Sequence, residues 1–188
     1  MKIEDLKITI LQDTREQRPL YLTGDKNVTV EVATLWPGDY TVKGFEKSIA
    51  FERKSVSDLI GTMCYAYSGK SAPWHSWKRF DYELNEFENH YDRAVIIVEP
   101  DESAAVWELA MSRGVKCDGM LSALAQIEAG LYRSSVPPRK VLAFLAALEA
   151  EHGCFVHLTK SRVESAEYLI EFARRYVRAR RHIVRRGV

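Results

Sequence analysis

The stretch GDYTVKGFEKSIAFERKSVSD, residues 38–58, decides the fold because it holds two strands and the turn that joins them. Tyr40–Val42 and Ile49–Arg53 are rich in the β-branched and aromatic residues that suit a pleated, half-buried surface. Gly44 lies in the short connection, where a residue without a side chain favours a tight turn. The stretch therefore predicts a β-hairpin.

The end of this stretch predicts that a helix follows the second strand directly. Ser55 has the side-chain oxygen that an N-cap needs, and Asp58 falls in the first turn. A negative charge is favourable there because it faces the positive end of the helix dipole. The hairpin is thus expected to lead into a helix without a linker.

Acidic and basic side chains are placed where they can converge on one point. Asp39 begins the first strand, and Glu52 and Lys54 are two residues apart on the second, so both point to the same face. Two carboxylates bind Mg²⁺ or Mn²⁺ through oxygen and leave positions for water and phosphate. A neighbouring lysine orients the attacking water or offsets charge on the phosphate. The pattern predicts phosphodiester hydrolysis with a divalent cation.

Each short motif also has an ordinary explanation. Gly-Asp is a common turn, and Glu-x-Lys is common on an exposed strand face. The ordered set favours an enzyme once Asp13 and Asp58 are added to it. Two other classes stay open: a non-catalytic DNA-binding scaffold, and a structural protein whose acidic cluster is a solvated face. The scaffold would bind DNA without cutting it, and the structural protein would bind neither DNA nor divalent cations.

The rest of the chain changes character near residue 92. Strands dominate before this point, and strands alternate with helices after it. This order predicts a single α/β domain with a mixed central sheet flanked by helices. Further strands are expected over residues 8–11, 28–34, 94–98 and 155–158, and helices over 74–91, 107–111, 120–131, 137–148 and 166–186.

Composition and charge agree with a globular protein that has separate sites for cations and phosphates. Apolar residues make up 46% of the 188 residues, and the net charge is +1. Seven of the 27 basic residues are arginines within residues 172–188, which contain no acid, so 20 basic residues face 26 acidic ones elsewhere. A mildly acidic body with a basic end fits a molecule that binds metal and nucleic acid.

The cysteines and the N-terminus predict a cytoplasmic protein. Cys64, Cys117 and Cys154 form no CxxC pair and no zinc spacing, so they are interpreted as buried or free thiols in a reducing compartment. The first ten residues lack the apolar core of a signal peptide. No apolar run approaches the length of a membrane span.

The ordered motifs resemble a known family. The runs Gly38–Tyr40 and Glu52–Leu59 look like the GD…ERKxxxD signature of the XPF-type nuclease domain, a member of the PD-(D/E)xK superfamily. Asp13–Glu16 is similar to the D-x-R-E element upstream of that signature. Arg79 leads a stretch that resembles the helix after the signature, and Val95–Glu99 looks like the family's apolar strand ending in Glu.

The resemblance covers about residues 8–175 and implies a restriction-endonuclease-like fold, in which helices flank a mixed β-sheet. We expect a single XPF-like nuclease domain over residues 1–188, with a basic C-terminal helix over about 162–186. The chain is too short for the tandem helix-hairpin-helix domain that many members carry. A compact bacterial or phage-type member is therefore expected, and its specificity for branched DNA stays open.

The resemblance also implies an activity and partners. It implies a metal-dependent DNA endonuclease that uses Mg²⁺ or Mn²⁺ and acts in repair or recombination. A structure-specific substrate, such as flapped or forked DNA, is one form that this activity takes in the family. Members often pair through the nuclease domain, so a homodimer is expected.

The family's site residues carry over to matching positions. Asp39 and Glu52 are expected to ligate the metal, Lys54 to assist the attacking water, and Asp13 to complete or support the metal site. The remaining signature residues, expected to orient the site, are Arg53 and Asp58.

Two groups of side chains are candidates for contact with nucleic acid. Basic residues at helical spacing would neutralise phosphates, although they also suit a solvated helix face. Aromatic residues near the start of the 74–91 helix either stack on bases or, as is commoner, anchor the core. The candidate phosphate contacts are Arg15, Arg79, Arg174, Arg178 and Arg181; the aromatic group with its polar neighbours is Trp74, His75, Trp77 and Lys78.

Overall fold

A six-stranded mixed β-sheet forms the centre of the protein. The computed structural model describes residues 2–67, 77–115, 119 and 121–185, without the side chains of 65–67, 77–79 and 182–185. The strand order is β2-β1-β3-β4-β5-β6. The β1–β2, β4–β5 and β5–β6 pairs are parallel, whereas β3 is antiparallel to both neighbours. The strands are β1 (Ile8–Asp13), β2 (Val28–Ala33), β3 (Tyr40–Val42), β4 (Ile49–Ser55), β5 (Arg93–Glu99) and β6 (Phe155–Leu158).

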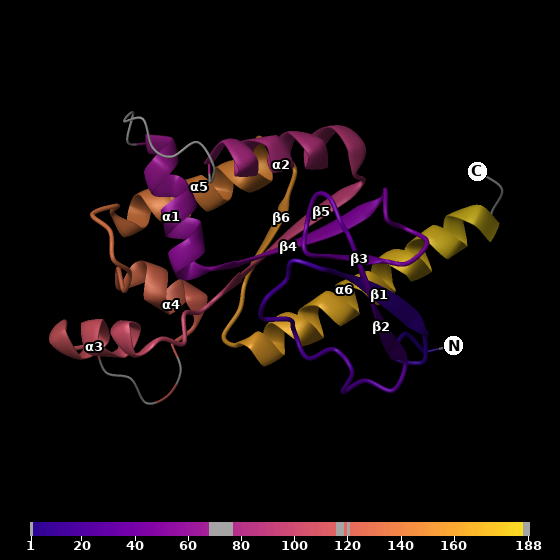
Figure 1. Ribbon diagram of the computed structural model, residues 1–188, viewed down its shortest axis with the longest axis horizontal. Helices are drawn as coiled ribbons and strands as arrows, with labels where there is room; N and C mark the ends of the chain where they lie inside the picture. Colours follow the sequence, from indigo (N-terminus) through magenta and orange to yellow (C-terminus); the bar gives the residue numbers. More distant parts are fainter. Residues whose placement is uncertain (1, 68–76, 116–118, 120, 186–188) are drawn as a thin grey trace.

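Helices cover both faces of the sheet (Figure 1). The long helix α6 packs on one face, where apolar residues of β1, β3, β4 and β5 meet it. Helices α1, α2, α4 and α5 pack on the other face. A small third cluster joins α3 to the segment after α4. The helices are α1 (Val56–Tyr67), α2 (Trp77–His90), α3 (Ala104–Ser112), α4 (Ala123–Glu128), α5 (Pro138–Ala150) and α6 (Arg162–Arg185).

Strand β4 shows why one end of the sheet becomes polar. Ile49 and Phe51 belong to the core beneath α6, and Ala50 belongs to the core beneath α1 and α2. Because side chains alternate along a strand, Glu52 and Lys54 leave the sheet on the α1 and α2 side. The strand is apolar where helices cover both of its faces, and it becomes charged at its carboxyl end.

The predicted fold class is confirmed: a mixed sheet flanked by helices in one domain. Each predicted strand is present, and the helix expected after Ser55 begins at Val56. Ser55 Oγ accepts a hydrogen bond from the backbone N–H of Asp58 at 3.1 Å, as the N-cap prediction required. Among the described helices, none combines the length and apolarity needed to cross a membrane.

Three details differ from the sequence-based expectations or extend them. β1 continues to Asp13, because the backbone N–H of Asp13 bonds the carbonyl of Asp39 at 2.8 Å. The helix expected over 120–131 is shorter: the side chain of Ser122 caps it, and it ends at Glu128. Cys64 and Cys154 are free thiols, whereas Cys117 lies outside the described residues.

Candidate active site

A cleft of about 600 Å³ lies at the ends of the central strands. Since β1, β4 and β5 run in the same direction, their carboxyl ends meet at one edge of the sheet, together with the start of β3. The lining includes Asp39, Glu52 and Asp58 of the predicted signature. Sequence positions that are distant from one another are therefore brought to a single polar hollow, which is where open α/β sheets commonly bind ligands.

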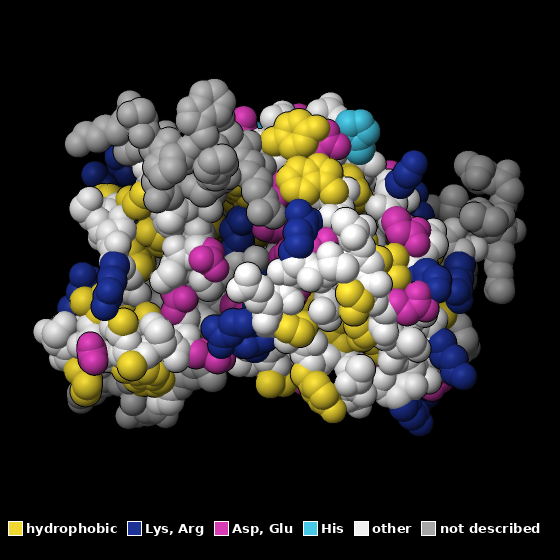
Figure 2. Space-filling model, viewed as in Figure 1, with side chains coloured by type: hydrophobic (Ala, Val, Ile, Leu, Met, Phe, Trp, Pro, Cys, Tyr) yellow, Lys and Arg dark blue, Asp and Glu magenta, His cyan; other side chains and the backbone are white. Residues whose placement is uncertain are grey.

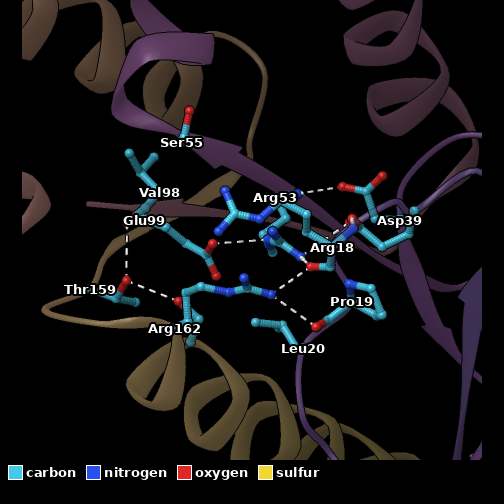
Figure 3. Close-up of polar contacts among 12 residues, drawn as sticks. Arg18, Pro19, Leu20, Asp39, Arg53, Ser55, Val98, Glu99, Thr159 and Arg162 are labelled. Atoms are coloured by element: carbon cyan, nitrogen blue, oxygen red, sulfur yellow. Dashed lines mark hydrogen bonds and ion pairs between the residues drawn. The ribbon is translucent and has the colours of Figure 1, made fainter. Parts of the chain in front are cut away.

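The turn before β3 fixes Asp39 against β4. Gly38 has φ of 91°, and a Cβ at this position would lie 3.1 Å from the carbonyl oxygen of Phe51, so a side chain would be strained and crowded. The backbone N–H of Asp39 donates to Phe51 O at 2.8 Å. The Oδ2 atom of Asp39 then accepts from the backbone N–H of Arg53 at 2.8 Å (Figure 3). Glycine is required at position 38 because the backbone of this turn lies against the backbone of β4 and leaves no room for a side chain.

Asp39 and Glu52 form a pair of carboxylates that repel each other. Burial and then the charge of Glu52 raise the pKa of Asp39 to about 8. Glu52 is itself buried, with 7% of its surface exposed. A protonated Asp39 at neutral pH relieves the repulsion, and a cation bound between the two groups would relieve it as well. The pair has the electrostatics of a cation site.

Lys54 lies beside this pair, on the face predicted from its spacing. Its Nζ atom is 3.0 Å from Oε1 of Glu52 and 4.3 Å from the centroid of the Phe80 ring in α2. Burial would lower the pKa of Lys54, but the charge of Glu52 and the hydrogen bond that Lys54 donates to Glu52 outweigh burial, so the pKa is raised. Lys54 is therefore a charged ammonium held in place by an acid and an aromatic ring.

Asp13 is buried, and both oxygens of its carboxylate accept hydrogen bonds from N–H groups. Its oxygens accept four hydrogen bonds, from the backbone N–H groups of Arg15 and Leu35 and from Nε and Nη2 of Arg15. Burial raises its pKa, but these bonds dominate and lower it. Of the two roles expected for Asp13, ligand or support, this geometry favours support, because a metal would have to displace those donors.

Alternation along β4 places Arg53 on the opposite face from Glu52. The guanidinium of Arg53 pairs with Glu99 (Figure 3). Its Nε atom is 3.0 Å from Oε2 of Glu99, and its Nη1 atom is 3.2 Å from Oε2 of Glu16. Nη1 also donates to the carbonyl of Arg18 at 2.6 Å. Glu99 is 3% exposed, and its Oε1 atom has no hydrogen-bond partner among the described residues. Arg53 thus ties β4 to β5 and to the segment after β1.

Asp58 lies in the first turn of α1 and lines the cleft. Its Oδ2 atom accepts a hydrogen bond from Ser55 Oγ at 2.8 Å. Ser57 follows Ser55 and donates from its backbone N–H and its hydroxyl to Asp101 at 2.8 and 2.7 Å. Asp58 therefore fixes the start of α1 beside the two carboxylates.

The donor set fits a hard cation held by few protein ligands. Among the described side chains, no group of three or more His, Cys, Asp or Glu residues forms a ready-made metal cage. Mg²⁺ is usually held by one or two carboxylates, with waters and substrate phosphates in its other positions. The partly buried carboxylate of Asp39 and the buried carboxylate of Glu52, which repel each other, match that requirement. Zinc, which favours His and Cys, does not fit.

The predicted phosphate contacts fall in different environments. Arg15 is half exposed at the cleft, and Arg178 and Arg181 are exposed on α6. Arg174 is a correction: it is 3% exposed, and its guanidinium binds both carboxylate oxygens of Asp25, at 2.8 and 2.9 Å, so it is not available to phosphate. The predicted candidates outside the described side chains are Arg79, Trp74, His75, Trp77 and Lys78.

Sequence reasoning missed two basic residues at the cleft. Arg162, at the start of α6, donates from Nη2 to the carbonyls of Arg18 and Pro19 at 2.7 and 2.9 Å (Figure 3). Both Arg162 and Arg18 line the cleft. The two arginines are 144 positions apart in the sequence, so their proximity depends on the fold and no local motif signals it.

Comparison with known proteins identifies the family of this chain. The family model of the ERCC4 domain matches residues 12–172. XPF from Aeropyrum pernix is similar in structure, with a TM-score of 0.58 and 21% identity, over 90% of this chain and 61% of that one. XPF from the same organism in complex with DNA gives a TM-score of 0.59 and 22% identity, over 92% and 66%. This chain thus spans less than two thirds of those proteins. No curated protein matches it.

Proposed function

Since the chain belongs to the ERCC4 domain family, we propose that it is a metal-dependent endonuclease that hydrolyses DNA phosphodiester bonds. The observation that carries this proposal is the pair formed by the partly buried Asp39 and the buried Glu52, with Lys54 beside it at the end of β4. Carboxylates that repel one another are stable when they share a proton or a cation. A cleft that exposes them to substrate has the composition that phosphodiester hydrolysis requires.

In this proposal Asp39 and Glu52 hold Mg²⁺ or Mn²⁺. The bound ion supplies a Lewis acid for a phosphate oxygen and lowers the pKa of water. Lys54 orients the attacking water or stabilises charge on the phosphate. Asp13 supports the site by fixing Arg15, whose exposed guanidinium then meets a DNA phosphate. Arg53 and Asp58 orient β4 and the start of α1 around these groups.

The proposed substrate is DNA, and specificity for a DNA structure is part of the proposal. The fold shared with XPF from Aeropyrum pernix, whose complex with DNA is known, supports a DNA substrate. Arg15, Arg18 and Arg162 add positive charge to the cleft. Pairing of two copies through this domain is also proposed, and the molar mass in solution tests it. The expected working compartment is the cytoplasm, where DNA is accessible in a bacterial or phage-infected cell.

Cleavage of a panel of end-labelled DNA tests the proposal. Single-stranded, duplex, flapped and forked DNA are incubated with wild type in Mg²⁺, Mn²⁺ or EDTA, and with Asp39→Asn in Mn²⁺. We expect cutting in Mg²⁺ or Mn²⁺, none in EDTA, and none by Asp39→Asn. A folded wild-type protein that binds DNA but leaves every substrate intact would instead be the non-catalytic scaffold.

A further inference from the structure

Two arginines lie at the end of the cleft where α6 begins. Arg162 is the first residue of α6, Arg18 follows β1, and both line the cleft that contains Asp39. Arg162 donates from Nη2 to the carbonyls of Arg18 and Pro19, at 2.7 and 2.9 Å. In the space-filling view, basic side chains gather with acidic ones where α6 begins (Figure 2). The fold thus brings two guanidinium groups to the cleft that contains the proposed cation site.

Both arginines keep N–H donors that no other group uses. Among the residues that the structure describes, the guanidinium of Arg162 donates only from Nη2, and its Nε and Nη1 atoms make no hydrogen bond. The exposed side chain of Arg18 makes no hydrogen bond or ion pair within the same described ranges, although its backbone does. A guanidinium presents five donors in a planar fork that matches the oxygens of a phosphate. The two arginines therefore have the free donors that a phosphate site needs.

The local charge favours an anion at this end of the cleft. Arg53 pairs with both glutamates there, Glu16 at 3.2 Å and Glu99 at 3.0 Å. Arg18 and Arg162 add two further positive charges, so three arginines stand against two glutamates and leave a net charge of +1. Since Arg53 already pairs with the glutamates, a phosphate would meet the two remaining arginines.

This end of the cleft is separate from the carboxylates of the proposed cation site. Alternation along β4 places Glu52 and Lys54 on the side of α1 and α2. Arg162 belongs to α6, which packs on the opposite face of the sheet, and it holds Arg18 there through the Arg18 carbonyl. A phosphate bound by Arg18 and Arg162 is therefore a different one from the phosphate that meets the cation.

We propose that Arg18 and Arg162 bind a second phosphate of the DNA strand, away from the phosphate that is cut. The strand then crosses the cleft from the cation site to the start of α6, and the second contact fixes its position. This inference rests on the proposed nuclease function and adds two substrate contacts to it. A strand that ends before the second phosphate lacks this contact, so we expect cutting inside strands rather than at their ends.

Removal of one phosphate charge at a time tests the inference. A forked DNA, whose junction fixes its position on the protein, is made as a series in which each member carries one neutral methylphosphonate at a different phosphate of the labelled strand. Fluorescence anisotropy in EDTA measures affinity without cleavage. The variants are Arg18→Ala, Arg162→Met and Arg15→Ala. The matched control is Arg175→Ala, because Arg175 is an exposed arginine of α6 that pairs with Glu171 and does not line the cleft.

We expect wild type to lose about 10- to 150-fold in affinity when the second phosphate is neutral, the cost of hydrogen bonds to a charged group. In Arg18→Ala and Arg162→Met, a methylphosphonate at that position should cost little, whereas Arg175→Ala should keep the wild-type pattern. Arg15→Ala should remove the sensitivity at a different phosphate.

The inference would be overturned by a wild-type pattern in both Arg18→Ala and Arg162→Met, or by a single sensitive phosphate that Arg15→Ala also removes. Arg18→Ala keeps the test valid if Arg162→Met does not fold, since the side chain of Arg18 makes no bond to the rest of the described structure.

A parallel cleavage reaction in Mn²⁺ separates this inference from the proposed function. Wild type that cuts DNA but shows no second sensitive phosphate would leave the nuclease standing and remove the second phosphate site. Wild type that shows the second sensitive phosphate but never cuts would keep the site and remove the nuclease. Where it cuts, a strand that ends before the second phosphate should be cut at least about 10-fold more slowly than a longer one, and equal rates would overturn the inference.

Discussion

The carboxylate of Asp39 is fastened to the backbone of Arg53 by a hydrogen bond of 2.8 Å. This bond joins the turn before β3 to the strand that carries Glu52, and it holds two acidic groups close together in a buried place. The repulsion between them is a cost of folding that the proposed function explains, because a bound cation would remove it.

Stability should depend on pH through Asp39. The pKa of Asp39 is about 8 in the folded protein, above the ordinary value of 3.8. Between about pH 4 and pH 8, the folded state therefore keeps a proton on Asp39 that the unfolded state has lost. The contribution of Asp39 to the free energy of unfolding is therefore present below pH 4 and is lost as pH rises towards 8. Urea unfolding of wild type and Asp39→Asn at several pH values measures it.

The informative quantity is the difference between the two proteins, because other titrating groups are common to both. We expect the free energy of unfolding of wild type, relative to Asp39→Asn, to fall as pH rises from 4 to 8. A difference that is flat with pH would mean that Asp39 is not held protonated in the folded protein. Mn²⁺ should restore stability to wild type at pH 8 and have little effect on the variant.

Lys54 should act on the reaction rather than on DNA binding. Lys54→Met keeps the length of the side chain and its contact with Phe80 but removes the charge. We expect kcat to fall by about 10²- to 10³-fold, since a charge stabilising the transition state is lost. Affinity for DNA in EDTA should stay within a few-fold of wild type. A large loss of affinity with unchanged kcat would assign Lys54 to substrate binding instead.

Arg53 should stabilise the fold through Glu99. Glu99 is buried and Arg53 is mostly buried, and Arg53→Ala would leave Glu99 charged without this partner. We expect a loss of about 3 kcal/mol in the free energy of unfolding, measured by urea titration. The control is Arg53→Met combined with Glu99→Gln, which removes both charges and should lose less than Arg53→Ala. Equal losses would show that packing, and not the charge of Glu99, sets the cost.

The arginines of α6 should differ in their roles: Arg174 should stabilise the fold, and Arg178 and Arg181 should contact DNA. Arg174→Met should lower the free energy of unfolding by about 2 kcal/mol, because it breaks the bidentate pair with Asp25. Its DNA affinity should match wild type. Arg178→Ala and Arg181→Ala should leave stability unchanged, and each should reduce the dependence of log affinity on log salt by about 1 if the residue contacts a phosphate. An unchanged salt dependence in both would mean a solvated helix face.

The sequence was sufficient to predict the strands of the sheet and the positions of the acidic groups along them. Alternation from Ile49 to Lys54 marks which side chains share a face, and the structure brings Lys54 to Glu52 as that alternation requires. The composition of the turn before β3 placed Asp39 at the start of its strand. These are local properties, so a single strand and its flanking turn are enough to predict them.

Contacts between distant segments cannot be predicted from local sequence patterns. Helical spacing put Arg174 on a basic stripe, but its partner Asp25 is 149 positions away. Trp36 reads as a turn residue, and its stacking on Tyr82 depends on how α2 packs against the start of β3. The resemblance left Asp13 to complete or support the metal site, and the hydrogen bond that it accepts from the backbone N–H of Leu35 could not be predicted, because Leu35 lies 22 positions away.

Asp39 and Glu52 are proposed to act together on one bound cation, and a double-mutant cycle on the cleavage rate tests whether they do. The rate constant for cutting one labelled forked DNA in saturating Mn²⁺ is measured for wild type, Asp39→Asn, Glu52→Gln and the double variant. We predict that each single change removes nearly all activity and that the double variant loses no more than either one, as residues that act as a unit do. Cleavage near the wild-type rate by either single variant would show that the two carboxylates do not form one cation site.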